Sequence, residues 1–380
     1  MSTEIRPFRI ETPEEDLVDL KQRLAATRWP DPETVDDWSQ GAPLAWMQEI
    51  CTYWKDTYDW RQTEARLNQR DQFLTEIDDV DIHFLHIRSP HSGALPLVLT
   101  HGWPGSIIEF QKVLDPLTNP KEHGGEEIDA FHLVVPTLPG YGYSGRPSAP
   151  GWSVEKIAGA WSQLMARLDY EWYAAQGGDW GAAVTTGIAI QDPEHCHAIH
   201  LNMPTVRPDP DTMDDLTEFE KDALAGIKHY QDWDSGYSKQ QSTRPQTLGY
   251  GLADSPSGQA GWILEKFWAW MDCDGHPENV LTKDELLDNV MMYWLTNAGA
   301  SSARLYWESF SRGSREPVNI PVGCSIFPKE IFRASRRWAE KRYSNIVYWN
   351  VLEKGGHFAA FEQPELYVGE VRAAFRHLRV

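Results

Sequence analysis

The stretch GGDWGA (177–182) ends a short apolar run and has the spacing of a nucleophile elbow, Gly-x-nucleophile-x-Gly. An elbow is a tight turn between a strand and a helix, and it presents its central side chain at the top of a sheet. The turn is strained and needs small neighbours, which the glycines and Ala182 provide. An esterase has serine at the centre, whereas this chain has Asp179. Asp179 is therefore either a nucleophile or the N-cap of a helix.

Buried-strand patterns recur on both sides of this turn. Apolar runs that end in turn residues stand at 96–100, 131–136, 172–176, 198–204, 321–328 and 345–351. Helix-length segments separate most of them, and VEKIAGAWSQLMARL (154–168) is one such segment. Short buried strands that alternate with helices are typical of a parallel sheet with crossover connections. The sequence therefore predicts an α/β fold with a mostly parallel sheet.

Four successive regions are expected along the chain. The stretch between the two halves of the alternating pattern is rich in Trp, Tyr and Asp and lacks buried-strand runs, so we interpret it as an inserted helical cap. The regions are an N-terminal helical arm with a first β-hairpin packing on the core (1–90), the first part of the core (91–204), the cap or lid (205–317) and the second part of the core (318–380). In the arm, Thr12 and Glu15 have the spacing of a helix capping box.

Composition limits the classes of partner. The 35 Lys and Arg against 56 Asp and Glu give a net charge of −21, and a chain this acidic repels phosphate backbones, so nucleic acid is not expected as a partner.

The four cysteines form no Cys-x-x-Cys pair. The first residues are too charged for a signal peptide, and no apolar run approaches the ~18 residues that span a bilayer. We expect a soluble, cytoplasmic protein without membrane contact. Dimerisation is plausible, but the sequence does not decide it.

Three further segments of the sequence contain the other groups that a nucleophile elbow works with. In THGWPGS (100–106) and in the elbow itself, the backbone N–H groups of Trp103 and Trp180 are expected to form an oxyanion hole. His357 follows a strand and two glycines near the end of the chain, where the nucleophile–acid–histidine order of such folds requires a base. The acid is expected at the end of the preceding strand, where Glu330 stands. The other reading of Glu330, and the less favoured one, is a surface glutamate that opens a helix.

With these motifs in place, the chain resembles the epoxide hydrolases of the microsomal and juvenile-hormone type. The similarity rests on HGWPGS, GGDWG, FPKE and GGHF together with the TPEEDL…RWP arm, and it covers nearly the whole chain. It implies an α/β-hydrolase fold with a cap. It also implies that two cap tyrosines hold the epoxide oxygen, and the matching segments GYSKQQSTRPQT and SSARLYWE contain Tyr237 and Tyr306. Members of the family often carry an N-terminal membrane anchor; we expect none here, so the sequence resembles a soluble microbial branch.

A carboxylate at the elbow suits substitution at an sp³ carbon. It has no proton to lose, so it attacks directly and forms an alkyl ester, which water activated by His357 then hydrolyses. Epoxides and alkyl halides both fit this scheme, and a haloalkane dehalogenase-like hydrolase is the alternative. A non-catalytic binding protein of the same fold is a further reading. The resemblance and the two tyrosines favour an epoxide hydrolase.

The expected substrate is a small apolar or aromatic epoxide, with water as the second reactant. The 18 tryptophans, many of them in the cap or near the loops, favour an aromatic-walled pocket. HCHAIH (195–200) brings three histidines together, but it leads directly into a buried strand and the chemistry needs no metal. We therefore expect neither a metal nor a cofactor.

Overall fold

A computed structural model describes residues 3–310 and 313–379. Within these residues nine strands form one sheet in the order β1-β2-β3-β5-β4-β6-β7-β8-β9. The strands are β1 (Ile5–Phe8), β2 (Gln72–Ile77), β3 (Val80–Ile87), β4 (Leu95–Thr100), β5 (Phe131–Pro136), β6 (Tyr173–Gly177), β7 (Cys196–Leu201), β8 (Val322–Ile326) and β9 (Ile346–Val351).

The sheet is mixed and mostly parallel, as the sequence predicts. Strands β4 to β9 run parallel to one another, whereas β1, β2 and β3 pair antiparallel at one edge. Every residue of β4, β6 and β8 is buried, which fits parallel strands covered on both faces. The expected hairpin is formed by β2 and β3. The edge strand β1 was not predicted, because four residues with a proline give little alternation to detect.

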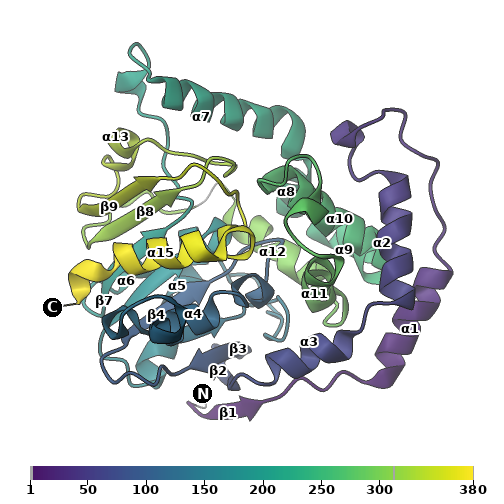
Figure 1. The fold of residues 1–380 in the computed structure, drawn as a ribbon, viewed down its shortest axis with the longest axis horizontal. Coiled ribbons are helices and arrows are strands. Elements are labelled where there is room, and N and C mark those ends of the chain that lie inside the picture. Colours follow the sequence, from purple (N-terminus) through teal and green to yellow (C-terminus); the bar gives the residue numbers. More distant parts are fainter. Residues whose placement is uncertain (1–2, 311–312, 380) are drawn as a thin grey trace.

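Helices cover both faces of the sheet (Figure 1). On one face α4 (Leu114–Thr118) contacts α15 (Pro364–Ala374), and α5 (Val154–Arg167) contacts α6 (Asp179–Gln191) on the other. The predicted crossover helix at 154–168 is therefore confirmed as α5. Two short helices, α13 (Arg336–Ala339) and α14 (Ala359–Glu362), lie between β8 and α15 in the chain.

The described residues between β7 and β8 form helices and no strands. They comprise α7 (Glu218–His229), a π-helical turn (Tyr230–Asp234), α8 (Gly236–Thr243), α9 (Pro245–Asp254), α10 (Pro256–Trp270), α11 (Lys283–Trp294) and α12 (Gly299–Ser309). In Figure 1 the green helices α8, α9, α10 and α11 lie beside the sheet, and the teal helix α7 lies above β8 and β9 in this view. Helices α8, α9 and α12 contact one another, as do α10 and α11.

The N-terminal arm runs along this helical insertion. Its helices α1 (Glu14–Ala25), α2 (Leu44–Asp56) and α3 (Trp60–Leu67) contact α10 and α11 (Figure 1). Three arm side chains donate hydrogen bonds to the buried carboxylate of Asp288 on α11, from Tyr58 (2.7 Å), Thr63 (2.5 Å) and Arg66 (2.5 Å). The arm and the insertion are thus joined by polar contacts inside the molecule.

The expected capping box at the start of the arm is wrong. Helix α1 begins at Glu14 with Pro13 as its N-cap and no side-chain cap. Thr12 instead bonds to α3, where its N–H donates to Glu64 (2.6 Å) and its hydroxyl accepts from the indole of Trp60 (2.8 Å). The Thr12 hydroxyl, which the sequence spacing assigned to a helix cap, therefore forms a contact with α3 instead.

Candidate active site

The turn around Asp179 is built as the sequence predicts. Strand β6 ends at Gly177 and α6 begins at Asp179, whose φ of 50° lies in the left-handed region that few non-glycine residues adopt. A Cβ at Gly181 would lie 1.9 Å from the carbonyl oxygen of Thr100 on β4. A Cβ at Gly102 would lie 2.2 Å from Oδ1 of Asp179 itself. A glycine in the first turn of α6 and a glycine in the loop after β4 therefore leave room for Asp179 in its strained backbone conformation.

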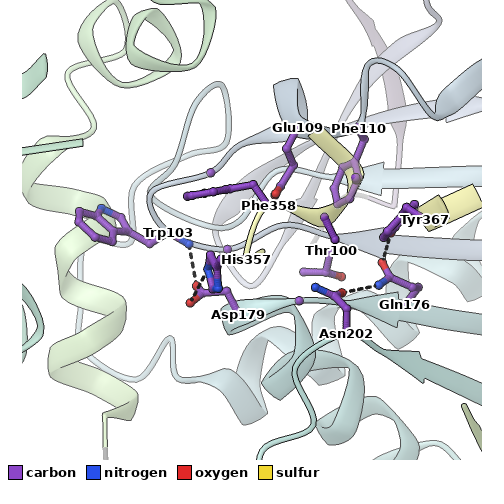
Figure 2. A pocket seen from close by; sticks show the side chains of 15 residues that line it. Thr100, Trp103, Glu109, Phe110, Gln176, Asp179, Asn202, His357, Phe358 and Tyr367 are labelled. Carbon is purple, nitrogen blue, oxygen red and sulfur yellow. Dashed lines mark hydrogen bonds and ion pairs between the residues drawn. The ribbon is translucent and has the colours of Figure 1, made fainter. Parts of the chain in front are cut away.

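One oxygen of this carboxylate is held by the loop after β4. The backbone N–H of Trp103 donates to Oδ1 of Asp179 over 2.8 Å (Figure 2). Trp180, the other predicted oxyanion donor, is the next residue after Asp179 in the first turn of α6. Its indole lies edge-on to the ring of Tyr306, and the indole nitrogen is buried with no hydrogen-bond partner among the described residues.

The other oxygen faces His357. The imidazole Nε2 lies 3.5 Å from Oδ2 of Asp179, and Nδ1 lies 2.7 Å from Oε1 of Glu330. Glu330 follows β8 and His357 follows β9, and both side chains are buried. Burial alone lowers the pKa of His357, but the carboxylates of Glu330 and Asp179 outweigh it and hold that pKa well above the ordinary value. The structure thus brings the three predicted residues into one chain of contacts.

Two tyrosines of the helical insertion line the same cavity as Asp179. Tyr237 on α8 stacks on the ring of Trp103 at a centroid distance of 4.8 Å, and Tyr306 on α12 lies 5.7 Å from Tyr237. Burial raises the pKa of both phenols well above the ordinary value, so their hydroxyls keep their protons. Tyr230, which sequence reasoning missed, donates a hydrogen bond to the hydroxyl of Tyr237 (3.2 Å).

A large cavity reaches both tyrosines and Asp179. It has a volume of about 970 Å³, which is enough for a drug-sized molecule. Its aromatic lining comprises Trp180, Tyr230, Tyr237, Tyr306, Phe310, Phe332 and Trp338. The cavity wall is therefore rich in aromatic side chains, as expected for a site that takes an apolar ligand. The lining also includes charged residues such as Arg207 and Lys341.

Glu109 is a second carboxyl near the site that sequence reasoning missed. It lies in a 3-10 turn (Ile107–Phe110) that follows the Trp103 loop (Figure 2). Burial is the main cause that raises its pKa to about 8. A signal was present in the sequence, because Glu109 is a charged residue between the apolar Ile108 and Phe110.

The three histidines at 195–200 do not gather. His195 contacts Asp192, the ring of His197 stacks on Trp172, and the buried His200 contacts Ser325. Burial lowers the pKa of His200 to about 3. Over residues 3–310 and 313–379 no group of three or more His, Cys, Asp or Glu side chains is arranged to hold a metal ion.

Comparisons with known proteins agree on one family. Residues 5–110 match the family model described as "Epoxide hydrolase N terminus", and residues 96–251 match the model of the alpha/beta hydrolase fold. A protein of Stigmatella aurantiaca named "Putative epoxide hydrolase" is 54% identical over 99% of this chain and 86% of the relative. The chain is thus similar to that bacterial protein over nearly its whole length.

Two solved structures are similar over the same extent. The epoxide hydrolase of Aspergillus niger superposes with a TM-score of 0.90 at 32% identity, covering 98% of this chain and 96% of that one. The juvenile hormone epoxide hydrolase of the silkworm Bombyx mori superposes with a TM-score of 0.89 at 31% identity, covering 100% and 96%. In the part of the chain that the structure describes, no helix is long and apolar enough to cross a bilayer.

Proposed function

This chain belongs to the epoxide hydrolases of the microsomal and juvenile-hormone type, and we propose that it opens its epoxide through a covalent ester on Asp179. In the first step a carboxylate oxygen attacks one epoxide carbon. In the second step water hydrolyses the ester and releases a vicinal diol. One observation carries the proposal: the two oxygens of the Asp179 carboxylate have different partners. Oδ1 accepts a hydrogen bond from the N–H of Trp103, and Oδ2 faces His357.

The surroundings of Asp179 support the first step. An epoxide oxygen is a poor leaving group and needs a proton donor as its carbon–oxygen bond breaks. Tyr237 and Tyr306 line the same cavity as Asp179, and burial keeps their hydroxyls protonated. We propose that both hydroxyls donate to the epoxide oxygen while Asp179 attacks from the opposite side.

The second step uses His357 and Glu330. Once Asp179 is esterified, its carbonyl carbon becomes the electrophile, and the N–H of Trp103 is set to stabilise the oxyanion that forms there. We assign a second such donor to the backbone of Trp180. His357 takes a proton from the attacking water, and Glu330 orients the imidazole and stabilises its charge.

The indole of Trp180 also suits the alternative, a haloalkane dehalogenase-like reaction. A departing halide is stabilised by N–H donors, and the buried indole nitrogen of Trp180 has no partner among the described residues. The two tyrosine hydroxyls instead suit an oxygen leaving group. Turnover of 1-haloalkanes at rates comparable with those of styrene oxide would favour the alternative.

The substrate that suits the large cavity is an apolar or aromatic epoxide. Its aromatic lining near Asp179 would exclude water from the reacting carbon and pack against an apolar substituent. We propose that the helices at 205–317 act as the cap that closes this cavity, because Tyr237 and Tyr306 both belong to them.

An isotope experiment tests the covalent route. In a single turnover in ¹⁸O-water with excess enzyme, the diol should emerge mostly unlabelled, because its new oxygen comes from Asp179. The label should appear in the peptide that contains Asp179. A diol that carries the label at once, with an unlabelled peptide, would show direct attack by water. Asp179→Ala should be inactive on the covalent route and could retain activity on the direct one.

A further inference from the structure

Lys266 on α10 is a buried cation next to the candidate active site. Only 7% of its side chain is exposed, and its ammonium pairs with the carboxylate of Glu265 over 2.6 Å. A buried ammonium is costly unless nearby groups compensate for its lost hydration. Its Nζ also lies 4.9 Å from the ring centre of Tyr237 and 5.6 Å from that of Trp270. The charge is therefore held against the ring of a tyrosine that we assign to the first step.

The hydroxyl of the same tyrosine receives a hydrogen bond from Tyr230. Tyr230 is buried and begins the π-helical turn at Tyr230–Asp234, a rare geometry that is frequent at functional sites. Its hydroxyl lies 3.2 Å from the hydroxyl of Tyr237 and 3.1 Å from that of Ser238. Ser238 donates its own proton to the carbonyl of Ser235, and burial raises the pKa of Tyr230. Tyr230 therefore keeps a proton that it can donate to either oxygen.

The other tyrosine of the pair, Tyr306, has different surroundings. Its ring contacts four aromatic rings, those of Trp103, Trp180, Tyr237 and Phe310. In the part of the chain that the structure describes, no Lys or Arg lies over the ring of Tyr306. A negative charge on Tyr237 would thus face an ammonium, whereas the described ring contacts of Tyr306 are uncharged.

Both contacts suit a phenol that gives up its proton. A phenol that passes its proton to an epoxide oxygen becomes a phenolate, and its negative charge spreads over the oxygen and the ring. A hydrogen bond to the oxygen and a cation near the ring both favour this charged form. Tyr230 supplies the first and Lys266 the second. An ammonium held out of water interacts more strongly with an aromatic ring than an exposed one does.

We propose that Lys266 and Tyr230 assist the first half-reaction, the alkylation step, by stabilising the negative charge that gathers on Tyr237 as its proton moves to the epoxide oxygen. The inference rests on the covalent route proposed above. Among the described residues, the wall of the large cavity includes Tyr230 and Tyr237 but not Lys266, so Lys266 acts through Tyr237. The two tyrosines then differ in role, because Tyr237 transfers its proton and Tyr306 donates a hydrogen bond to the same oxygen.

The proposed step balances as follows. An oxygen of the Asp179 carboxylate forms a bond to one epoxide carbon, and the electron pair of the broken carbon–oxygen bond passes to the epoxide oxygen. That oxygen takes the proton of Tyr237, which becomes a phenolate and accepts a hydrogen bond from Tyr230. Hydrolysis of the ester by water then yields the diol, the Asp179 carboxylate and one proton, and this proton returns to Tyr237. The net reaction is the addition of one water to the epoxide.

The test measures the rate of alkylation in a His357→Gln parent, in which the ester should accumulate. Single-turnover mixing with styrene oxide, with rapid quenching and intact-mass analysis, gives this rate. Lys266→Met removes the charge but keeps an unbranched side chain over the rings, and it should slow alkylation by about 10-fold. Lys266→Arg keeps the charge and should stay within about 3-fold of the parent.

Lys283→Met is the matched control. Lys283 also lies over a tyrosine ring, that of Tyr53, and pairs with a glutamate, Glu49, but it does so between α11 and the N-terminal arm. This variant should leave the rate of alkylation within about 2-fold of the parent.

A double-mutant cycle shows through which tyrosine Lys266 acts. In a Tyr237→Phe background, Lys266→Met should slow alkylation by less than about 2-fold, because no charge forms on that ring. In a Tyr306→Phe background it should keep its effect of about 10-fold. Tyr230→Phe leaves Lys266 in place and gives an independent test. It should slow alkylation by about 3- to 10-fold, with the same dependence on Tyr237.

The outcomes separate the inference from the function on which it rests. If Lys266→Met and Tyr230→Phe alkylate as fast as the parent, or if their effects are equal in the two Phe backgrounds, the inference is overturned while the covalent route stands. A loss that Lys266→Arg shows to the same extent as Lys266→Met would mean that the charge is not the cause, and it would also overturn the inference. If the His357→Gln parent forms no adduct, the covalent route itself fails, and the inference fails with it.

Discussion

Nδ1 of His357 lies 2.7 Å from Oε1 of Glu330, although 27 positions separate the two residues in the chain. The contact joins the loops after two neighbouring parallel strands, β8 and β9, and it directs Nε2 of His357 toward Asp179. On the proposed route, a histidine held in this way takes a proton from the water that attacks Cγ of the Asp179 ester.

Removal of the imidazole should stop the second half-reaction only. A carboxylate needs no base to attack, so His357→Gln should form the alkyl-enzyme and slow its breakdown by about 100-fold or more. Intact-mass analysis after epoxide addition should show one adduct of the substrate mass. Asp179→Ala is the control and should show none. A correctly folded His357→Gln protein without an adduct would contradict this division of roles.

The two tyrosines should act in the first half-reaction. Tyr237→Phe and Tyr306→Phe should each slow alkylation by about 10-fold, and the double variant by about 100-fold or more, because proton donation to the epoxide oxygen is lost. Tyr250→Phe serves as the control, since Tyr250 is an exposed tyrosine on α9. Near-normal epoxide turnover by the double variant would exclude this assignment.

The pH dependence of ester breakdown should report on His357. Glu330, Asp179, Glu109 and Glu362 carry the titratable carboxyls that act on this imidazole or are influenced by it. His357 acts as a base only when neutral, and the Glu330 carboxylate raises its pKa, so breakdown should rise with pH. Glu330→Gln removes that charge and should move the midpoint of the rise to lower pH by about one unit or more, with a lower maximal rate. An unchanged midpoint in single-turnover measurements would count against the contact.

The arm should stabilise the protein through Asp288. Asp288→Ala leaves the hydroxyls of Tyr58 and Thr63 without their acceptor, and it should lower the free energy of unfolding by about 2–4 kcal/mol. Arg66 is half-exposed, so its share is small. Asp284→Ala on the same helix removes an exposed contact with Tyr53 and should cost less than about 1 kcal/mol. Denaturant unfolding measures both, and equal losses would contradict the prediction.

The sequence by itself determined the α/β fold with its mostly parallel sheet, the turn at Asp179 and the candidates His357 and Glu330. Buried parallel strands read as continuous apolar runs, and a strained turn needs glycines, so both leave local marks. The structure adds the contacts of His357 with Asp179 and Glu330. The roles of these residues in catalysis are proposals. Tyr237 and Tyr306 came from resemblance to a family, because a single tyrosine among 14 carries no local mark.

Only the tertiary structure decided which distant groups share a cavity with Asp179. Glu109 and His357 are 248 positions apart, and they share a small cavity because the loops after β4 and β9 meet at the same edge of the sheet. Thr12 likewise bonds to α3 rather than capping its own helix. Such contacts depend on how distant segments pack against one another. The spacing of residues in the sequence predicts only contacts between near neighbours along the chain.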